Sequence, residues 1–277
     1  MSKKELTLQE IKNIEFNLLI DFDAFCRQNQ IRYFLAYGTL LGAIRYKGFI
    51  PWDDDIDVLV PREDYDRIIK LYKDSERYRL YSIERNRKFG YPFAKLCDVK
   101  TIKEEENIDN GIKQGVEIDV FPLDYWDNDI DVAKKEVLQL KKNMFGLNLA
   151  KMKSALASTP WKSFLLKIIM LGCRTLGSKF FVDRIIKIGK QNNQNHSAYI
   201  GNKVWCPYGD RDICPSKIFS NSIEIEFEGR KFPAPVGYDA YLTRLYGNYL
   251  PEPPKEKQKT HHAFKAYRIS DVHDETE

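Results

Sequence analysis

The segment PWDDDIDV places four carboxylates within five positions, namely Asp53, Asp54, Asp55 and Asp57. Like charges crowded this closely repel one another, so the cluster calls for a cation. On a strand, Asp55 and Asp57 project from the same face while the residues beside them point into the core. Carboxylate oxygens without nearby His or Cys favour Mg²⁺ or Mn²⁺ over zinc. We therefore expect Asp55 and Asp57 to hold such an ion, with Asp53 as a further ligand and Asp54 facing solvent; a solvated acidic loop is the alternative.

Two further features extend this candidate site. In VEIDVFPLD, Glu117 and Asp119 alternate onto one strand face, so Asp119 completes a three-carboxylate metal site unless the face is merely polar. Upstream, Gly38 and Thr39 lie where a strand passes into a helix, a junction that offers backbone N–H groups and a hydroxyl to a phosphate. An ordinary turn is the alternative for that pair.

Hydrophobic periodicity indicates the elements that must position these residues. A capping box of Thr7 and Glu10 precedes an amphipathic helix over 7–29. Next come a strand at 31–37, a helix that starts directly after Gly38, a strand at 56–60 and a helix over 62–73. Further strands are expected at 78–83, 93–99, 115–121 and 222–228, the last followed by a turn at Glu228-Gly229 and a helix near 237–246.

The chain changes character between its two mixed regions. Residues 129 to about 195 have a helical period throughout, whereas 251–262 is Pro-rich and extended, and the last dozen residues are expected to be loose. The pattern predicts an α/β (α+β) protein with a mixed sheet core at 1–128, a basic helical insertion at 129–200 and a C-terminal part at 201–277 that completes the substrate cleft.

Composition narrows the class of protein. The 277 residues are 43% apolar and 30% charged, which is ordinary for a folded soluble protein. The charged N-terminus MSKKELTLQE has no apolar run behind it, so we expect no secretory signal and a cytoplasmic location. The five cysteines are scattered, never spaced as C-x-x-C, and are expected to be reduced thiols.

Charge is distributed unevenly along the chain. Residues 131–190 hold 13 Lys and Arg against the three acids Asp131, Glu136 and Asp183, a local charge of +10 in a chain of net +4. Within 163–178, Ser163, Lys167, Arg174 and Ser178 form one polar stripe on an otherwise apolar helix, as in helices that lie in a membrane interface. The alternative is a helix packed on the core with a solvated face. No nucleic-acid-binding motif accompanies the charge, so we expect peripheral membrane contact through 129–190 and no nucleic acid.

The order of strand, Gly-Thr, helix, Asp-x-Asp and a third Asp on a neighbouring strand resembles the nucleotidyltransferase fold. More narrowly, YGTLLGAIRYKGFIPWDDDIDV (37–58) resembles the signature of the LicD family, bacterial cholinephosphotransferases related to the fukutin-type ribitol-phosphate transferases. EIDVFPLD (117–124) and YLTRLYGNYLPEPPKEKQKTHH (241–262) are also similar to family segments. The helical block between them is not matched in detail.

This resemblance implies transfer of phosphocholine from CDP-choline to a hydroxyl of a glycan, of the teichoic acid or lipopolysaccharide type, with release of CMP. The acceptor is expected to be lipid-linked and the enzyme to work at the inner face of the cell membrane. Asp55 and Asp57 would hold the metal, and Asp119 would ligate it or accept the proton of the acceptor hydroxyl.

Other side chains are candidates for substrate contact. Arg45, close in sequence to Gly38, suits a bidentate phosphate contact, and Lys95 in FAKLCDV is expected to face the same cleft. Trp52 offers an aromatic face to the quaternary ammonium of choline, as do Tyr37, Tyr91, Tyr125 and Trp126. His261 follows a Pro-rich arm that is expected to fold back over the site. The alternatives are an exposed loop charge for Arg45, ordinary core packing for the aromatic residues, and a mobile tail for His261.

Two alternative functions remain open. One is an enzyme of the same fold with another donor, such as CDP-ribitol, CDP-glycerol or a nucleoside triphosphate. The other is a non-catalytic protein that binds glycan or membrane. The complete acidic cluster argues against a non-catalytic protein, because such a protein has no reason to keep four crowded carboxylates that repel one another.

Overall fold

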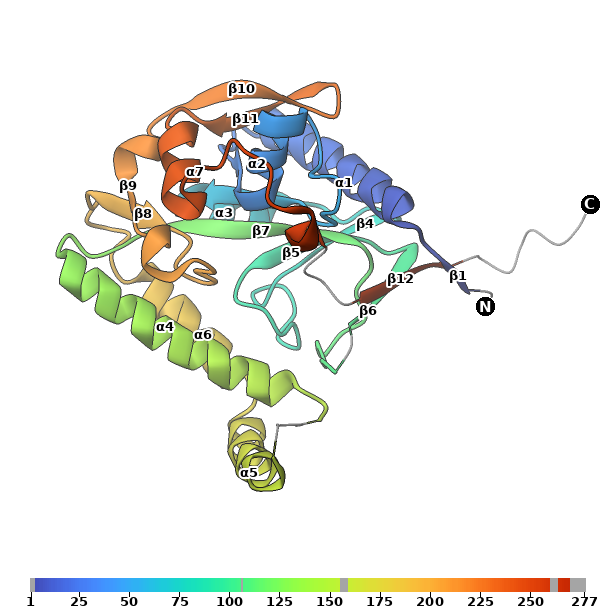
Figure 1. The fold of residues 1–277 in the computed structure, drawn as a ribbon, viewed down its shortest axis with the longest axis vertical. Helices are drawn as coiled ribbons and strands as arrows, with labels where there is room; N and C mark the ends of the chain where they lie inside the picture. Colours follow the sequence, from blue (N-terminus) through green and yellow to red (C-terminus); the bar gives the residue numbers. More distant parts are fainter. Residues whose placement is uncertain (1–2, 106, 155–158, 260–263, 270–277) are drawn as a thin grey trace, which may run out of the picture.

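The computed structural model describes residues 3–105, 107–154, 159–259 and 264–269. Its centre is a mixed seven-stranded sheet, in which β3 and β7 run parallel and the other neighbours run antiparallel (Figure 1). The strand order is β2 (Phe34–Leu35), β3 (Asp57–Pro61), β7 (Glu117–Tyr125), β5 (Ala94–Asp98) and β4 (Tyr78–Tyr81), with β8 (Tyr199–Gly201) paired to β7 and β9 (Cys214–Pro215) paired to β8. The α/β class with a mixed sheet is confirmed.

The middle strands are apolar because both faces of the sheet are covered. Val58, Val60, Ile118 and Val120 are fully buried, as expected for parallel strands that lie between layers of helices. Helices α1 (Leu8–Gln28), α2 (Tyr37–Tyr46) and α3 (Arg62–Leu71) surround this part of the sheet, whereas α4 (Ile130–Lys151) lies beyond its opposite face (Figure 1).

Helix α1 begins as its sequence predicts. The Thr7 hydroxyl accepts a hydrogen bond from the Glu10 backbone N–H, and the Glu10 carboxylate accepts one from the Thr7 N–H at 2.9 Å. This reciprocal capping box satisfies N–H groups that a helix start leaves open. The buried side includes Ile11, Ile14 and Leu18, spaced by three and four residues.

The predicted strand at 31–37 is shorter than expected, because only Phe34–Leu35 pairs with β3. The following helix starts at Tyr37, one residue before Gly38, and Tyr37 has a positive φ of 46°. A non-glycine residue in this region is strained, and such residues persist where surrounding contacts hold them.

The prediction that the last dozen residues are loose is wrong for their first part. β12 (Phe264–Ile269) lies between β1 (Lys3–Glu5) and β6 (Thr101–Glu105) in a separate antiparallel sheet. Single-sequence periodicity misses it because β12 pairs with strands that are over 150 residues away. Residues 270–277 lie outside the described part of the chain.

The helical character of 129–195 is confirmed, since the described residues of this range form the helices α4, α5 (Pro160–Leu176) and α6 (Ser178–Lys190). A single helix over 163–178 is wrong, since Gly177 with φ of 78° separates α5 from α6 and puts Ser178 on the second. The C-terminal part contains the hairpin β10 (Ser222–Phe227) and β11 (Arg230–Pro235), turning at Glu228-Gly229 as predicted, then α7 (Tyr238–Tyr246). Short 3₁₀ turns are η1 (Gly209–Asp212), η2 (Ser216–Phe219) and η3 (Lys255–Lys257).

Candidate active site

Three charged residues lie in one row across the sheet. Asp57 on β3 is the register partner of Asp119 on β7, and Asp119 is in turn the partner of Lys95 on β5. Side chains at directly opposed positions project from the same face of a sheet. The structure thus brings together Asp57, Asp119 and Lys95, which the sequence placed at one site from separate motifs.

Lys95 is the electrostatic centre of this row. It is buried, and its Nζ lies 2.9 Å from Asp119 Oδ1 and 3.1 Å from Glu117 Oε1. Burial opposes the charge on Lys95, but Asp119 and Glu117 raise the pKa of its ammonium well above the usual value. Lys103 adds a second cation at 2.7 Å from Glu117, so Lys103 and Lys95 together hold the pKa of the buried Glu117 below its usual value against the effect of burial.

The pKa values of Asp57 and Asp119 shift upward, in the direction opposite to the shift of Glu117. Burial raises the pKa of the Asp57 carboxyl well above its ordinary range, and the charges of Asp55 and Asp119 raise it further. Burial also raises the pKa of Asp119, although Lys95 opposes the shift. Like-charge repulsion and desolvation of this kind are relieved by a cation or by a proton, so these oxygens are suited to bind a metal or to accept a proton.

The fit to a divalent metal can be judged from the donor set. Within the described residues, no three His, Cys, Asp or Glu side chains are gathered closely enough to hold an ion by themselves. Mg²⁺ usually takes only one or two protein carboxylates and completes its shell with water and substrate phosphate. Asp57 and Asp119, with Asp55 two residues before, satisfy that smaller requirement. Ligation by all three carboxylates stays a prediction.

The acidic loop is held in place by α1. Lys12 Nζ donates hydrogen bonds to the backbone oxygens of Ile50 at 3.0 Å and Pro51 at 2.9 Å, two residues before the first of the four aspartates. Asp54 is buried with 6% of its surface exposed, so the prediction that it faces solvent is wrong. No local pattern predicts that α1 covers this loop.

Gly38 and Thr39 position the aspartates. A Cβ added to Gly38 would lie 2.6 Å from Asp53 Oδ2, so only glycine lets that carboxylate approach the first turn of α2. The buried Thr39 hydroxyl accepts a hydrogen bond of 2.8 Å from the Asp57 backbone N–H, at the start of β3. Thr39 therefore orients the strand that carries Asp57; its predicted contact with phosphate, like that of Gly38, stays a prediction.

The strained Tyr37 is held by a buried acid. Its hydroxyl donates to Asp212 Oδ1 at 3.0 Å, and Asp212 Oδ2 accepts from the Tyr208 N–H at 2.7 Å. Burial raises the pKa of Asp212 to about 7, against the effect of these hydrogen bonds. The Tyr37 and Tyr208 rings stack with centroids 5.8 Å apart. Because Tyr37 is almost fully buried, it is a packing residue more than an open aromatic face.

The C-terminal arm folds back onto α2. Arg45 Nη2 donates to the Pro251 carbonyl oxygen, and the Tyr46 hydroxyl donates to Glu252 Oε1 at 2.8 Å. The predicted phosphate ligand Arg45 thus contacts the arm. The half-buried Trp52 packs edge-on against Tyr46 with ring centroids 6.4 Å apart. His261, expected at the end of the arm, lies outside the described residues.

Lys151 lies beside the candidate site, although no sequence pattern predicted it there. It is the last residue of α4, it is buried, and its Nζ lies 3.4 Å from the centroid of the Tyr91 ring. Lys95 Nζ lies 4.5 Å from the same ring. Burial and the charge of Lys95 lower the pKa of Lys151 to about 7. The basic helical region thus contributes an amino group beside the Lys95 and Asp119 pair, which no local pattern could show.

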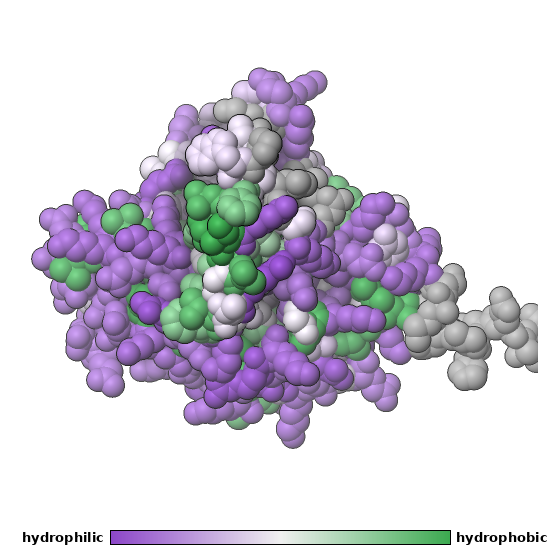
Figure 2. Space-filling view, turned by 90° about the horizontal axis from the view of Figure 1, so that it is seen from below, coloured by the Kyte–Doolittle hydropathy of each residue, from purple (hydrophilic) through white to green (hydrophobic). Residues whose placement is uncertain are grey.

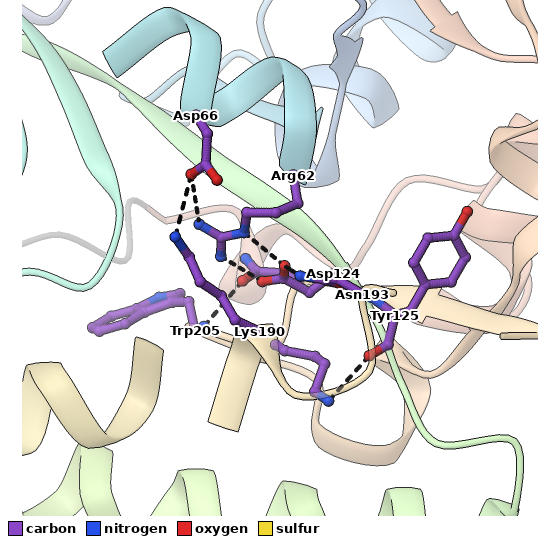
Figure 3. A network of polar contacts seen from close by, with 9 residues as sticks. Arg62, Asp66, Asp124, Tyr125, Lys190, Asn193 and Trp205 are labelled. Carbon is purple, nitrogen blue, oxygen red and sulfur yellow. Dashed lines mark hydrogen bonds and ion pairs between the residues drawn. The ribbon is translucent and has the colours of Figure 1, made fainter. Parts of the chain in front are cut away.

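A second missed feature is a polar network with a buried centre at the far end of β7 (Figure 3). Arg62 makes a bidentate contact with Asp124, at 2.7 Å from Nε to Oδ1 and 2.6 Å from Nη2 to Oδ2. Asn193, just after α6, donates to Asp124 Oδ1 at 2.6 Å, and Lys190 lies 3.4 Å from Asp66 on α3. This network joins β7, α3 and the helical region, and so fixes the strand that carries Asp119.

Comparison with known proteins places this arrangement in a family. The family model for the LicD/FKTN/FKRP nucleotidyltransferase domain matches residues 30–125, the segment that holds Gly38, the acidic loop and Asp119. The chain is 33% identical over 277 aligned positions to the lipopolysaccharide cholinephosphotransferase LicD of Haemophilus influenzae, covering 95% of this chain and 99% of that protein. It is also 29% identical over 92 residues to protein RP689 of Rickettsia prowazekii, covering 33% of this chain and 34% of the other. Similarity along nearly the whole length, including the helical region, shows that the chain belongs to the LicD family and is a transferase.

Proposed function

We propose that the protein transfers phosphocholine from CDP-choline to a hydroxyl of a bacterial cell-surface glycan, of the lipopolysaccharide or teichoic acid type, and releases CMP. The observation that carries this proposal is the similarity along almost the whole chain to a lipopolysaccharide cholinephosphotransferase. The row of Asp57, Asp119 and Lys95 supports it, because phosphoryl transfer depends on charge stabilisation and positioning.

In the proposed reaction, the acceptor oxygen forms a bond to the phosphocholine phosphorus as the bond from that phosphorus to the CMP oxygen breaks. The hydroxyl proton passes to the Asp119 carboxylate, whose raised pKa suits it to receive a proton. Lys95 holds Asp119 in place through the 2.9 Å ion pair. Asp55 and Asp57 would hold Mg²⁺ or Mn²⁺, which would neutralise charge on the donor phosphates.

The remaining parts of the site are assigned to substrate binding. Trp52, half-buried beside Tyr46, supplies an aromatic face to the trimethylammonium group. Arg45 and the arm at 251–254 close one side of the donor site, since Arg45 already contacts the Pro251 carbonyl. We further propose that the enzyme works in the cytoplasm at the inner face of the membrane, where its acceptor is lipid-linked.

Ligand-induced thermal stabilisation tests the donor without knowledge of the acceptor. The unfolding midpoint is measured with CDP-choline, CDP, CMP, CDP-glycerol and ATP, each with Mg²⁺ and with a chelator. The proposal predicts a Mg²⁺-dependent rise for CDP-choline that exceeds the rise for CDP. A larger rise with CDP-glycerol or ATP would replace the donor, and no rise with any nucleotide would contradict the transferase assignment of this site.

A further inference from the structure

Helix α5 presents its apolar side to solvent. Phe164 is 67% exposed, and Trp161 and Leu171 are each 65% exposed. With 3.6 residues per turn these side chains fall on one side of the helix, together with Ile168 and Leu165. Figure 2 looks onto this end of the molecule and shows apolar side chains gathered into a patch that hydrophilic residues surround. Contiguous exposed apolar patches on a folded chain mark interaction sites.

The other side of α5 packs against the end of α4. Leu166, Met170 and Cys173 contact Leu149 and Met152 there, in a small cluster beside the main core, which Cys173 also contacts. Figure 1 shows α5 at the extremity of the molecule, on the opposite end from the β10–β11 hairpin. Only one narrow side of this helix is therefore buried, and its broad apolar side has no cover within the described residues.

The charges around α5 are basic. Lys162 and Lys167 lie at the two borders between the buried side and the apolar side, and both are exposed. Arg174 turns inward and donates a hydrogen bond of 3.0 Å to the Lys153 carbonyl oxygen. The stripe of Ser163, Lys167 and Arg174 that the sequence predicts is therefore a flank of the helix, while the surface that projects furthest is apolar.

We propose that α5 is a peripheral membrane anchor that lies flat in the interface of an anionic phospholipid bilayer. Its apolar side enters the boundary between headgroups and acyl chains, and Lys162 and Lys167 bind headgroup phosphates, as in other interfacial amphipathic helices. Within the described residues no helix is long and apolar enough to cross a membrane, which fits a helix lying in the plane. This inference deepens the proposed function and rests on it for the lipid-linked acceptor.

Anionic lipid is the occupant that the charges favour. The segment 131–190 carries 13 basic residues against three acids, and a surface of anionic lipid attracts such a segment through its negative potential. A second copy of this chain would bring two such basic segments together, which is unfavourable. The combination of a projecting apolar side and a basic surround therefore points to the membrane.

The test is sedimentation of the full chain with vesicles of phosphatidylcholine alone or with about 30% phosphatidylglycerol, a composition that gives a negative surface potential. The test variant is Phe164→Ser with Ile168→Ser. The matched control is Leu71→Ser with Val236→Ser, which removes apolar side chains that are 46% and 45% exposed elsewhere. We expect binding to anionic vesicles that weakens with salt and that the test variant lowers by about tenfold or more, while the control binds like the wild type.

Other outcomes would overturn the inference. Absence of vesicle binding, or equal binding by the test variant, would remove α5 as an anchor. A wild-type dimer that the test variant dissociates, without vesicle binding, would show that α5 is an interface between copies. The thermal shift with CDP-choline in free solution reports separately on the proposed function, so vesicle binding without that shift would support the anchor and reject the donor.

Discussion

Replacement of Arg62 by methionine tests the network that anchors the strand carrying Asp119. Asp124 has no exposed surface and Arg62 only 8% exposed side chain, so the variant leaves a buried carboxylate with Asn193 as its remaining side-chain hydrogen-bond donor among the contacts described above. Removing one partner of a buried ion pair typically costs about 3–5 kcal/mol, because the other charge stays desolvated.

The cost translates into a measurable midpoint. Unfolding entropy near 60 °C is about 2.1 cal/mol/K per residue, so a chain of 277 residues has about 0.6 kcal/mol/K. A loss of 3–5 kcal/mol then lowers the unfolding midpoint by about 5–9 °C. The assay is thermal unfolding by circular dichroism, with denaturant unfolding as an independent measure of the free energy.

Arg27→Met is the matched control. Arg27 pairs with Asp23 at 2.8 Å and with Glu224 at 3.2 Å, but its side chain is 51% exposed, and exposed ion pairs contribute about 0–1 kcal/mol each. Its midpoint should fall by less than about 4 °C. Equal midpoints for Arg62→Met and wild type, or equal losses for the two variants, would refute the assignment of Arg62 and Asp124 as a buried, desolvated pair.

Three further variants examine the site itself. Asp57→Asn should lower turnover by at least about 100-fold, because it removes charge stabilisation. The unfolding midpoint should not fall at neutral pH and should rise, because Asn removes a buried charge that burial and the charges of Asp55 and Asp119 disfavour. Turnover like that of the wild type would reject the site. Lys151→Met should be more stable than wild type at pH 6, and this gain should vanish near pH 10.5. The pKa of Lys151 is about 7 in the folded state and has the ordinary value of 10.5 in the unfolded chain. Between these two pH values the unfolded wild-type chain binds more protons than the folded one, so the stability of the wild type rises with pH. A constant difference from pH 6 to 10.5 would contradict this titration. Gly38→Ala should displace the Asp53 carboxylate, since its Cβ would lie 2.6 Å from Asp53 Oδ2, and should lower turnover by about tenfold or more; unchanged kinetics would show that this close approach has no role.

Local patterns in the sequence predicted most of the central fold. Alternation in IDVLV and VEIDV placed the two inner strands within two residues of their start, and the capping box at Thr7 fixed the beginning of α1. The misses came from pairing between distant segments. β12 pairs with β1 on one side and β6 on the other, and the periodicity within FKAYRI does not predict this pairing.

In the site, too, local patterns predicted some residues, whereas residues placed by contacts between distant segments were missed. Asp57, Asp119 and Lys95 were found because each lies on a strand whose alternation sets its face. Lys151 and the Asp124 network were not found, because they depend on how α4 and α6 dock against the sheet, with contacts across more than 50 residues. The burial of Asp54 likewise follows from the tertiary position of α1 and not from its own neighbours in sequence.

The most direct test of the central claim is phosphorus NMR of CDP-choline incubated with the protein, Mg²⁺ and bacterial lipopolysaccharide. The account predicts that CMP and a glycan-linked phosphocholine signal appear together, and that both are lost with a chelator and in Asp57→Asn. Transfer that continues unchanged with the chelator and in Asp57→Asn would contradict the account.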